Sequence, residues 1–238
     1  MSEFNLEEFA LTAERIRSKT AAEGRLMDNP SDQELEVIVE AEPGIKKTIY
    51  GSMVARSEPM SRAAMFTRNS VDHRFGKAEQ ALLVQCEKVL STKRLICIDR
   101  LVGNQGSRTV VRLIVPQEFA HVAFGGKNLF TQVKHAYEQP DYTIIMFADE
   151  AFEANKSKPL LEKEITIRLA MLSDGRVIKV IRNSNYIGEY KKGVFAAEDW
   201  IAKTRRGGIF IHAGCREDYL QSSRGDYRTT RTLLASLS

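Results

Sequence analysis

The sequence predicts a mixed α/β fold in which a mixed sheet is flanked by helices. Three observations lead to this class. Apolar residues recur at helical spacing in several segments, compact β-branched runs lie between those segments, and an Asp-Gly turn joins two neighbouring β-branched runs. The chain has 238 residues, of which 43% are hydrophobic and 28% are charged, so it is long enough to bury a sizeable core.

Two helices are expected near the N-terminus. The first covers residues 5–23, with Asn5 as its N-cap and Gly24 as the left-handed residue that ends it. Its apolar residues at helical spacing are Leu6, Phe9, Ala13 and Ile16. The segment Ser31-Asp32-Gln33-Glu34 has the capping-box pattern and predicts a second helix from Ser31. Its continuation over residues 35–41 is compatible with either a helix or a strand.

From residue 46 onward, β-branched and aromatic runs are separated by short turns. A strand is expected over residues 48–55, followed by an Arg-rich loop over residues 56–74 that is long enough to suggest function. A helix over residues 77–90 leads into an apolar strand over residues 94–99. A strand over residues 109–115, a short helix over 117–124 and a strand over 142–147 follow.

In the C-terminal third, Asp174-Gly175 predicts a hairpin between residues 164–171 and 176–181. A helix over residues 188–204, ended by Gly207-Gly208, precedes an apolar strand over residues 209–212. The last residues are polar and offer little to bury. We therefore expect one domain over residues 1–215 and a weakly anchored polar tail over residues 216–238.

Composition disfavours several classes of protein. The net charge is only +4 and acidic residues are interspersed with basic ones, so neither nucleic acid nor a membrane is an expected partner. Cys86, Cys97 and Cys215 are far apart, which argues against a disulfide framework or a zinc finger and favours a reducing cytoplasm. No signal peptide and no apolar run of about 20 residues is present.

The most informative segment is Asn185-Tyr186-Ile187-Gly188-Glu189-Tyr190-Lys191-Lys192-Gly193, followed by a helix and a strand ending in His212. Gly188 permits a tight entry into the helix, whose N-terminal dipole lowers the pKa of a nearby lysine. A neutral lysine has a lone pair for a metal, so Lys192 and His212 could share one cation. The pattern is equally compatible with a solvated pair of lysines and a histidine in an ordinary hydrogen bond.

These residues resemble the ATP-dependent phosphoenolpyruvate carboxykinase family, whose pattern is Tyr-x-Gly-Glu-x-Lys-Lys and then a strand ending in His-Cys-Ser-Ala. Upstream segments resemble its strand, Gly turn, Arg-bearing strand and Lys-Asn-Met-Phe helix end: residues 93–99 with Val102-Gly103, 111–114, and Lys127-Asn128-Leu129-Phe130. The similarity covers residues 92–214. It implies an N-terminal-domain-like fold and the gluconeogenic reaction of oxaloacetate with ATP to give phosphoenolpyruvate, CO₂ and ADP, catalysed by a carboxy-lyase.

The resemblance also implies site residues. Arg56, in a segment that loosely resembles Gly-Arg-Ser-Pro, and Tyr186 would face the oxaloacetate or phosphoenolpyruvate. Lys192 and His212 would be ligands of a catalytic Mn²⁺ or Mg²⁺, with Lys192 also contacting substrate. Lys191 would help to hold an anionic group. An arginine fork and a divalent ion are suited to a carboxylate and to the enolate that forms when oxaloacetate loses CO₂.

Two departures from the family pattern limit the expected activity. No phosphate loop of the G-x-x-x-x-G-K-[ST] type is present, and His-Ala-Gly-Cys replaces His-Cys-Ser-Ala. The first hypothesis is therefore a truncated substrate- and metal-binding half that uses ATP only when a partner chain supplies a nucleotide-binding domain. A stand-alone domain for a small dicarboxylate and a catalytically dead interaction or scaffold domain are the alternatives.

Overall fold

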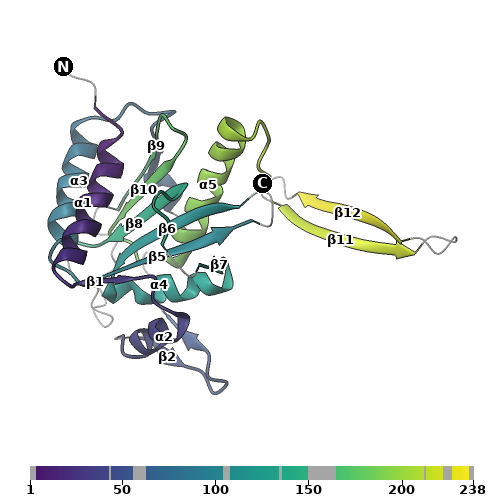
Figure 1. The fold of residues 1–238 in the computed structure, drawn as a ribbon, viewed down its shortest axis with the longest axis horizontal. Coiled ribbons are helices and arrows are strands. Elements are labelled where there is room, and N and C mark those ends of the chain that lie inside the picture. The colour runs from purple at the N-terminus through teal and green to yellow at the C-terminus, as the bar shows by residue number, and fades with distance from the viewer. Residues whose placement is uncertain are drawn as a thin grey trace.

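The computed structural model describes residues 4–42, 44–55, 63–103, 108–133, 136–149, 165–211, 213–221 and 227–235. Its centre is an eight-stranded sheet (Figure 1). The strand order is β1 (Leu26–Asp28), β5 (Leu95–Val102), β6 (Thr109–Pro116), β8 (Tyr142–Phe147), β10 (Val177–Arg182), β9 (Thr166–Met171) and β4 (Thr67–Asn69), with β7 (Thr131–Gln132) paired to β5. The pairs β5–β6, β5–β7 and β9–β10 are antiparallel and the others are parallel, which confirms the mixed sheet.

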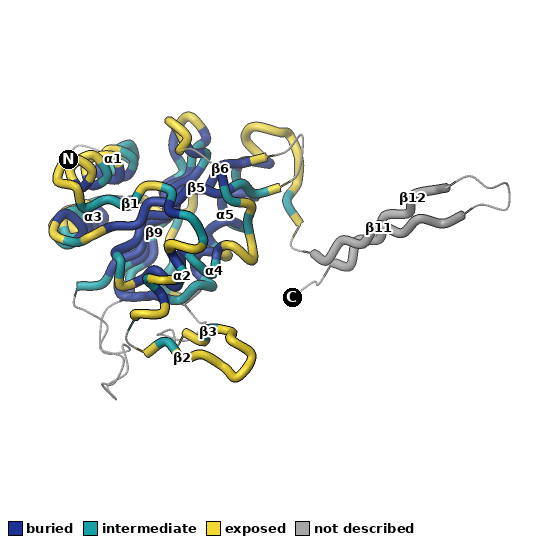
Figure 2. The backbone as a smooth tube through the Cα atoms, turned by 60° about the horizontal axis from the view of Figure 1, so that its bottom comes forward, coloured by how far each residue is buried: buried dark blue, intermediate teal, exposed yellow. Residues whose placement is uncertain are grey.

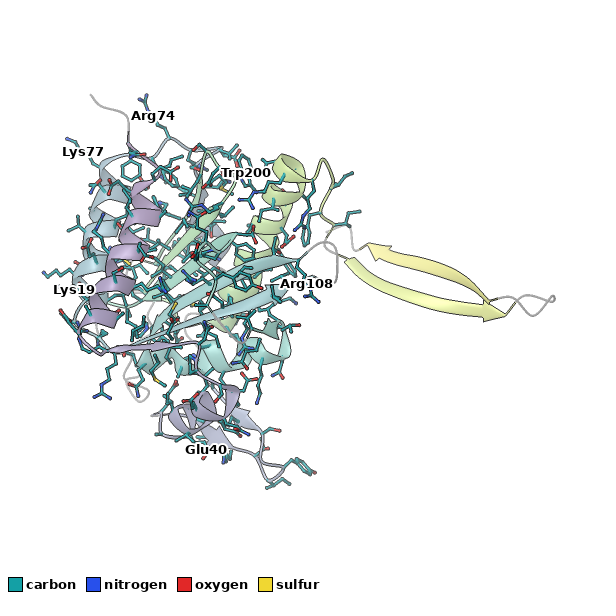
Figure 3. All side chains as sticks on the ribbon, in the orientation of Figure 1. Lys19, Glu40, Arg74, Lys77, Arg108 and Trp200 are labelled. Atoms are coloured by element: carbon teal, nitrogen blue, oxygen red, sulfur yellow. The ribbon has the colours of Figure 1, made fainter. Side chains whose placement is uncertain are left out.

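Helices cover both faces of the sheet. One face carries α1 (Glu8–Ala22) and α3 (Lys77–Leu90), and the other carries α2 (Asp32–Glu40), α4 (Ala120–Gly125) and α5 (Ile187–Arg205). Along β5, Leu95 and Cys97 belong to the apolar cluster beneath α1 and α3, whereas Ile96 and Ile98 belong to the apolar cluster beneath α2, α4 and α5. A strand buried on both faces is a continuous apolar run, which is what residues 95–98 show (Figure 2). Charged side chains such as Lys19 and Lys77 lie on the outside of α1 and α3 (Figure 3).

Several expected elements are confirmed. The helix over residues 77–90 and the strand over residues 142–147 have the expected bounds. The predicted hairpin is β9–β10, with Gly175 at φ 82° in its turn. The segment after β6 forms the 3₁₀ turn η2 (Gln117–Phe119), α4 and the 3₁₀ turn η3 (Gly126–Asn128). Gly24 follows α1 at φ 68°. The helix begins later than expected because the first turn has i to i−3 hydrogen bonds, from the Glu8 N–H to the Asn5 carbonyl and from the Phe9 N–H to the Leu6 carbonyl, and Asn5 Oδ1 caps this turn by accepting the Glu7 N–H.

The second helix begins with a capping box. Ser31 Oγ accepts the Glu34 N–H at 3.2 Å, and Glu34 Oε2 accepts the Ser31 N–H at 2.7 Å. Residues 32–40 are therefore helical rather than extended. We expect Ser31→Ala to lower the free energy of unfolding by about 1 kcal/mol in urea denaturation. Ser18→Ala, on the exposed part of α1, is the control, and an equal loss in both variants would contradict the role of the box.

The strand expected over residues 48–55 is confirmed only at its end, where β3 (Met53–Val54) pairs with β2 (Lys46–Lys47). Residues 48–52 form the turn between these two short strands instead. Thr48 Oγ1 accepts the N–H groups of Tyr50 and Ser52, and Gly51 has φ 77°, so local hydrogen bonds replace an extended strand.

The Arg-rich loop is also shorter than expected. Residues 56–62 lie outside the described part of the chain, but residues 63–69 form the 3₁₀ turn η1 (Ala63–Phe66) and β4. Strand β4 pairs in parallel with β9. The prediction of a continuous loop is wrong for this stretch because distant pairing, which the local sequence does not show, makes it the edge of the sheet.

The apolar strand expected over residues 209–212 is not formed by residues 209–211, and His212 lies outside the described residues. Ile209 and Ile211 are 81% and 52% exposed, so this apolar run does not enter the core. Further on, β11 (Ala213–Gln221) and β12 (Tyr227–Ala235) pair in antiparallel fashion as a separate two-stranded sheet. Across the described ranges, no helix has the length and apolarity needed to span a bilayer.

Candidate functional site

The first turns of α5 carry three of the predicted site residues. Tyr186 is the N-cap residue, with φ −75° and ψ 118°. The Lys192 Nζ lies 5.3 Å from the centroid of the Tyr186 ring, so the structure brings these two residues together. Lys191 is exposed, with its Nζ 5.4 Å from the centroid of the Phe195 ring. The other two predicted residues, Arg56 and His212, lie outside the described part of the chain.

Gly188 is required for the position of Tyr186. A Cβ atom on Gly188 would lie 2.1 Å from Cε1 and 2.6 Å from the hydroxyl oxygen of Tyr186. Beyond the tight helix entry expected from the sequence, Gly188 makes room for an aromatic ring. Any side chain at this position would displace the ring from the start of α5.

A buried carboxylate lies directly beneath Lys192. Glu189 is 2% exposed, and its Oε1 accepts a hydrogen bond from Lys192 Nζ at 2.7 Å. Its Oε2 accepts from Lys179 Nζ at 2.9 Å, and Lys179 also donates to the Glu189 backbone carbonyl at 2.9 Å. Lys179 is buried in the middle of β10, on the face that α5 covers. One carboxylate thus joins a lysine of the sheet to a lysine at the helix surface.

The pKa values of this cluster follow from burial and charge together. Burial, the largest influence, lowers the pKa of Lys179, and the Glu189 carboxylate opposes that change. Burial raises the pKa of Glu189, but the ammonium groups of Lys179 and Lys192 outweigh it and hold the pKa below its usual value. Glu189 is therefore ionised at neutral pH. The helix dipole is the one influence on Lys192 that the sequence predicts, and the carboxylate partner Glu189 is visible only in the structure.

His121 links the start of α5 to α4 and to the turn that follows α2. The Nε2 of His121, in α4, lies 3.0 Å from the backbone oxygen of Asn185, which directly precedes Tyr186. Its Nδ1 lies 2.9 Å from Glu42 Oε2, and its backbone N–H donates to Glu42 Oε1 at 2.9 Å. Because a carbonyl oxygen only accepts, the proton between His121 and Asn185 lies on Nε2. The sequence offers one signal for this role, which is a histidine within an otherwise apolar short helix.

A second buried ion pair links the central strands. Asp99 and Arg112 are direct neighbours across β5 and β6, and both side chains are buried. Arg112 Nε and Nη2 each donate to one Asp99 oxygen at 2.8 Å, and the Tyr137 N–H donates to Asp99 Oδ2 at 2.8 Å. This pair is a structural element rather than an exposed binding group, because its hydrogen bonds are made within the protein.

Other chemistry finds little support among the described residues. They contain no group of three or more His, Cys, Asp or Glu side chains arranged to hold a metal ion. Cys86 and Cys97 are buried, and burial raises the pKa of the Cys97 thiol to about 12. Burial likewise raises the pKa of Cys86. These two thiols therefore stay protonated and are unsuited to nucleophilic catalysis.

The lysine site, which consists of Tyr186, Glu189, Lys191 and Lys192, lies within a segment that matches a known protein family. The family model for phosphoenolpyruvate carboxykinase, in its ATP-dependent form, matches residues 64–227. The chain belongs to the ATP-dependent phosphoenolpyruvate carboxykinase family. The mixed α/β fold fits this assignment, and the match extends beyond residues 92–214, where the sequence resemblance is clearest. Carboxykinases of this family are lyases of gluconeogenesis that generally use ATP and a divalent metal. The match includes Tyr186, Lys191, Lys192 and His212, and it begins after Arg56.

Proposed function

We propose that the start of α5 binds a divalent cation and a small dicarboxylate, as the substrate- and metal-binding part of a phosphoenolpyruvate carboxykinase. One observation carries the proposal. Tyr186 and Lys192, which match the family pattern Tyr-x-Gly-Glu-x-Lys-Lys, lie beside each other with Lys192 Nζ 5.3 Å from the tyrosine ring. The Lys192 side chain is 40% exposed, so it is accessible to a ligand.

The residues of this region suit a substrate such as oxaloacetate or phosphoenolpyruvate. Lys191 provides one positive charge, and the metal that Lys192 would hold at the adjacent position would provide more, so an acid with two anionic groups is attracted. The Tyr186 hydroxyl can donate a hydrogen bond that orients a carboxylate. Arg56, through its guanidinium fork, is proposed as a further carboxylate-binding residue on the basis of the resemblance.

The donor set is compatible with Mn²⁺ or Mg²⁺. Lys192 supplies an amine nitrogen, and His212 is proposed to supply an imidazole nitrogen. The amine must lose one proton to coordinate a metal, and the neutral amine keeps two N–H groups, one of which can still donate to Glu189. Glu189 then retains Lys179 as a partner, so its buried charge stays compensated. When bound, the metal would supply positive charge that stabilises the enolate of the substrate.

ATP requires a further component in this proposal. The 238 residues contain no G-x-x-x-x-G-K-[ST] sequence, whose backbone N–H groups cradle phosphates in nucleotide-binding loops. We propose that the nucleotide is bound by a domain on a partner chain or outside these residues. The chain alone then binds metal and acid, and the conversion of oxaloacetate to phosphoenolpyruvate depends on that domain.

Calorimetric titration with Mn²⁺, with and without oxalate as an enolate mimic, tests the proposal. We expect the chain to bind Mn²⁺, and we expect oxalate to strengthen that binding. Lys192→Met should weaken Mn²⁺ binding roughly tenfold or more, because it removes a ligand. Lys203→Met is the matched control on the same helix, since Lys203 is exposed and pairs only with Asp199 among the described residues.

The proposal fails if a folded chain binds no Mn²⁺, or if Lys192→Met and Lys203→Met bind it equally well. His212→Ala provides an independent arm, because it is expected to weaken Mn²⁺ binding without touching Glu189. Saturable ATP binding by the isolated chain would contradict the part of the proposal that assigns the nucleotide to another domain.

A further inference from the structure

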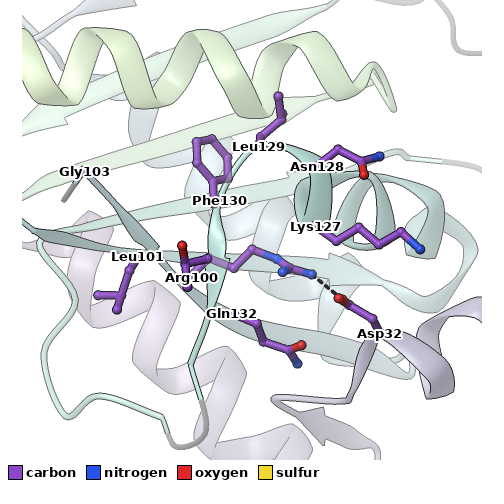
Figure 4. A pocket seen from close by; sticks show the side chains of 10 residues that line it. Asp32, Arg100, Leu101, Gly103, Lys127, Asn128, Leu129, Phe130 and Gln132 are labelled. Atoms are coloured by element: carbon purple, nitrogen blue, oxygen red, sulfur yellow. Dashed lines mark hydrogen bonds and ion pairs between the residues drawn. The ribbon is translucent and has the colours of Figure 1, made fainter. Parts of the chain in front are cut away.

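A cavity of about 390 Å³ lies beside β5, β7, η3 and the start of α2 (Figure 4). None of Tyr186, Lys191 and Lys192 lines it. Its lining combines charged, amide and apolar side chains, among them Asp32, Arg100, Lys127, Gln132, Leu101 and Phe130. The volume is suited to a small organic molecule rather than to a single water.

Arg100 is the buried cation of this cavity. Its side chain is 1% exposed, yet the contacts of its guanidinium with the described residues are made by Nη2 alone. Nη2 donates to Asp32 Oδ1 at 2.8 Å and to the Ala123 carbonyl at 3.3 Å. Nε has no hydrogen-bond partner among the described residues. A guanidinium has five N–H donors, so this buried charge is only partly compensated.

The balance of charge favours an anion. Asp32, the acidic residue of the lining, is 36% exposed and opposes two cations, Arg100 and Lys127. The Lys127 Nζ lies 3.7 Å from the centroid of the Phe124 ring. An aromatic ring has no net charge, so this contact does not neutralise the positive charge of Lys127. The lining therefore carries one net positive charge, and a ligand with one negative charge would balance it.

Two aromatic rings form the contact between the cavity lining and α5. The ring of Phe130, which lines the cavity, meets the ring of Tyr190 edge to face, with centroids 5.1 Å apart. Tyr190 is fully buried in α5. An occupant of the cavity would thus contact Phe130, whereas Tyr186, Lys191 and Lys192 do not line the cavity.

We propose that this cavity binds a small organic acid through one singly charged oxyanion group, a carboxylate or a phosphate monoanion. The oxyanion lies between Arg100 and Lys127, where it completes the partial compensation of the guanidinium by Asp32. The carbon chain of the acid packs against Leu101 and Phe130. The site is separate from the proposed Mn²⁺ and dicarboxylate site and does not require a metal.

NMR titration of the ¹⁵N-labelled chain tests this site without Mn²⁺. Butyrate and dimethyl phosphate, each singly charged at neutral pH, are the two charged probes, and butyramide is the neutral analogue of butyrate. We expect at least one charged probe to shift the backbone amides of residues 127–132 saturably, and butyramide to leave them unchanged. The probe that binds more tightly identifies a carboxylate or a phosphate as the preferred group.

Lys127→Met should weaken the binding of that probe roughly tenfold, because it removes one charge-assisted contact without touching the buried Arg100. Lys192→Met and Lys203→Met should bind it as the unaltered chain does. Equal effects of butyrate and butyramide, no effect of either charged probe, or unchanged binding by Lys127→Met would overturn the proposal. Loss of binding in Lys192→Met would also overturn it, because the probe would then occupy the lysine site.

Discussion

Replacing Asp99 with alanine is expected to lower the free energy of unfolding by about 3–5 kcal/mol, as measured by urea denaturation. Asp99 accepts two hydrogen bonds from Arg112 and one from the Tyr137 N–H within the buried centre of β5 and β6. Removing it leaves a buried guanidinium without a counter-charge. An arginine does not escape this cost by deprotonation, because its guanidinium is effectively always protonated in proteins.

Two controls test whether the loss of stability comes from the unpaired charge of Arg112. Asp199→Ala removes an exposed carboxylate from α5 and should change stability by less than about 0.5 kcal/mol. The double variant Asp99→Leu with Arg112→Leu should be more stable than Asp99→Ala, because neither partner is left charged and unpaired. A loss below about 1 kcal/mol for Asp99→Ala would mean that Arg112 finds another partner or reaches solvent.

Glu189→Met is expected to cost nearly as much, with an upper limit of about 5 kcal/mol at pH 7. The substitution leaves the buried Lys179 ammonium without its carboxylate partner. Unlike Arg112, Lys179 can lose its proton, and at pH 7 this costs at most about 1.4 kcal/mol for each of the 3.5 pH units below the ordinary lysine pKa of 10.5. Thermal and urea denaturation would both measure the loss.

The double variant Glu189→Met with Lys179→Met separates charge from packing. It should recover most of the stability lost in Glu189→Met, because the uncompensated cation has been removed. If the double variant is as unstable as the single one, the loss arises from packing at the contact between α5 and the sheet. Such a result would contradict the electrostatic explanation.

The parts of the fold that depend on local sequence could be predicted. The helix over residues 77–90, the capping box at Ser31 and the hairpin at Asp174-Gly175 each depend on residues close together in the chain. The errors arise where distant contacts decide the structure. Residues 67–69 become a strand through pairing with β9, and Ile209 and Ile211 stay exposed although their sequence is typical of a buried strand.

The lysine site could be predicted only in part. The family resemblance assigns Tyr186 and Lys192 to one site, and the structure places them near each other, although helical spacing alone does not make residues six apart neighbours. Spacing does not reveal that Lys179 and Lys192 share Glu189, because that contact depends on how closely α5 packs on β10. A charged residue at position 179 within an apolar strand was the available signal, since a lysine there must either reach solvent or find a buried partner. The partner itself follows only from the three-dimensional structure.

The segment that matches the family is shorter than the unit that folds cooperatively. The hydrogen bonds of His121 show this difference. The family match starts at residue 64, but Glu42, which holds His121 against Asn185, lies before it. Strand β1 also pairs with β5, and α1 packs with α3 in the same apolar cluster. The matched segment therefore begins inside an intact core. A polypeptide that starts at residue 64 would lose the residues that hold the start of α5 in place, although every lysine of the site would still be present.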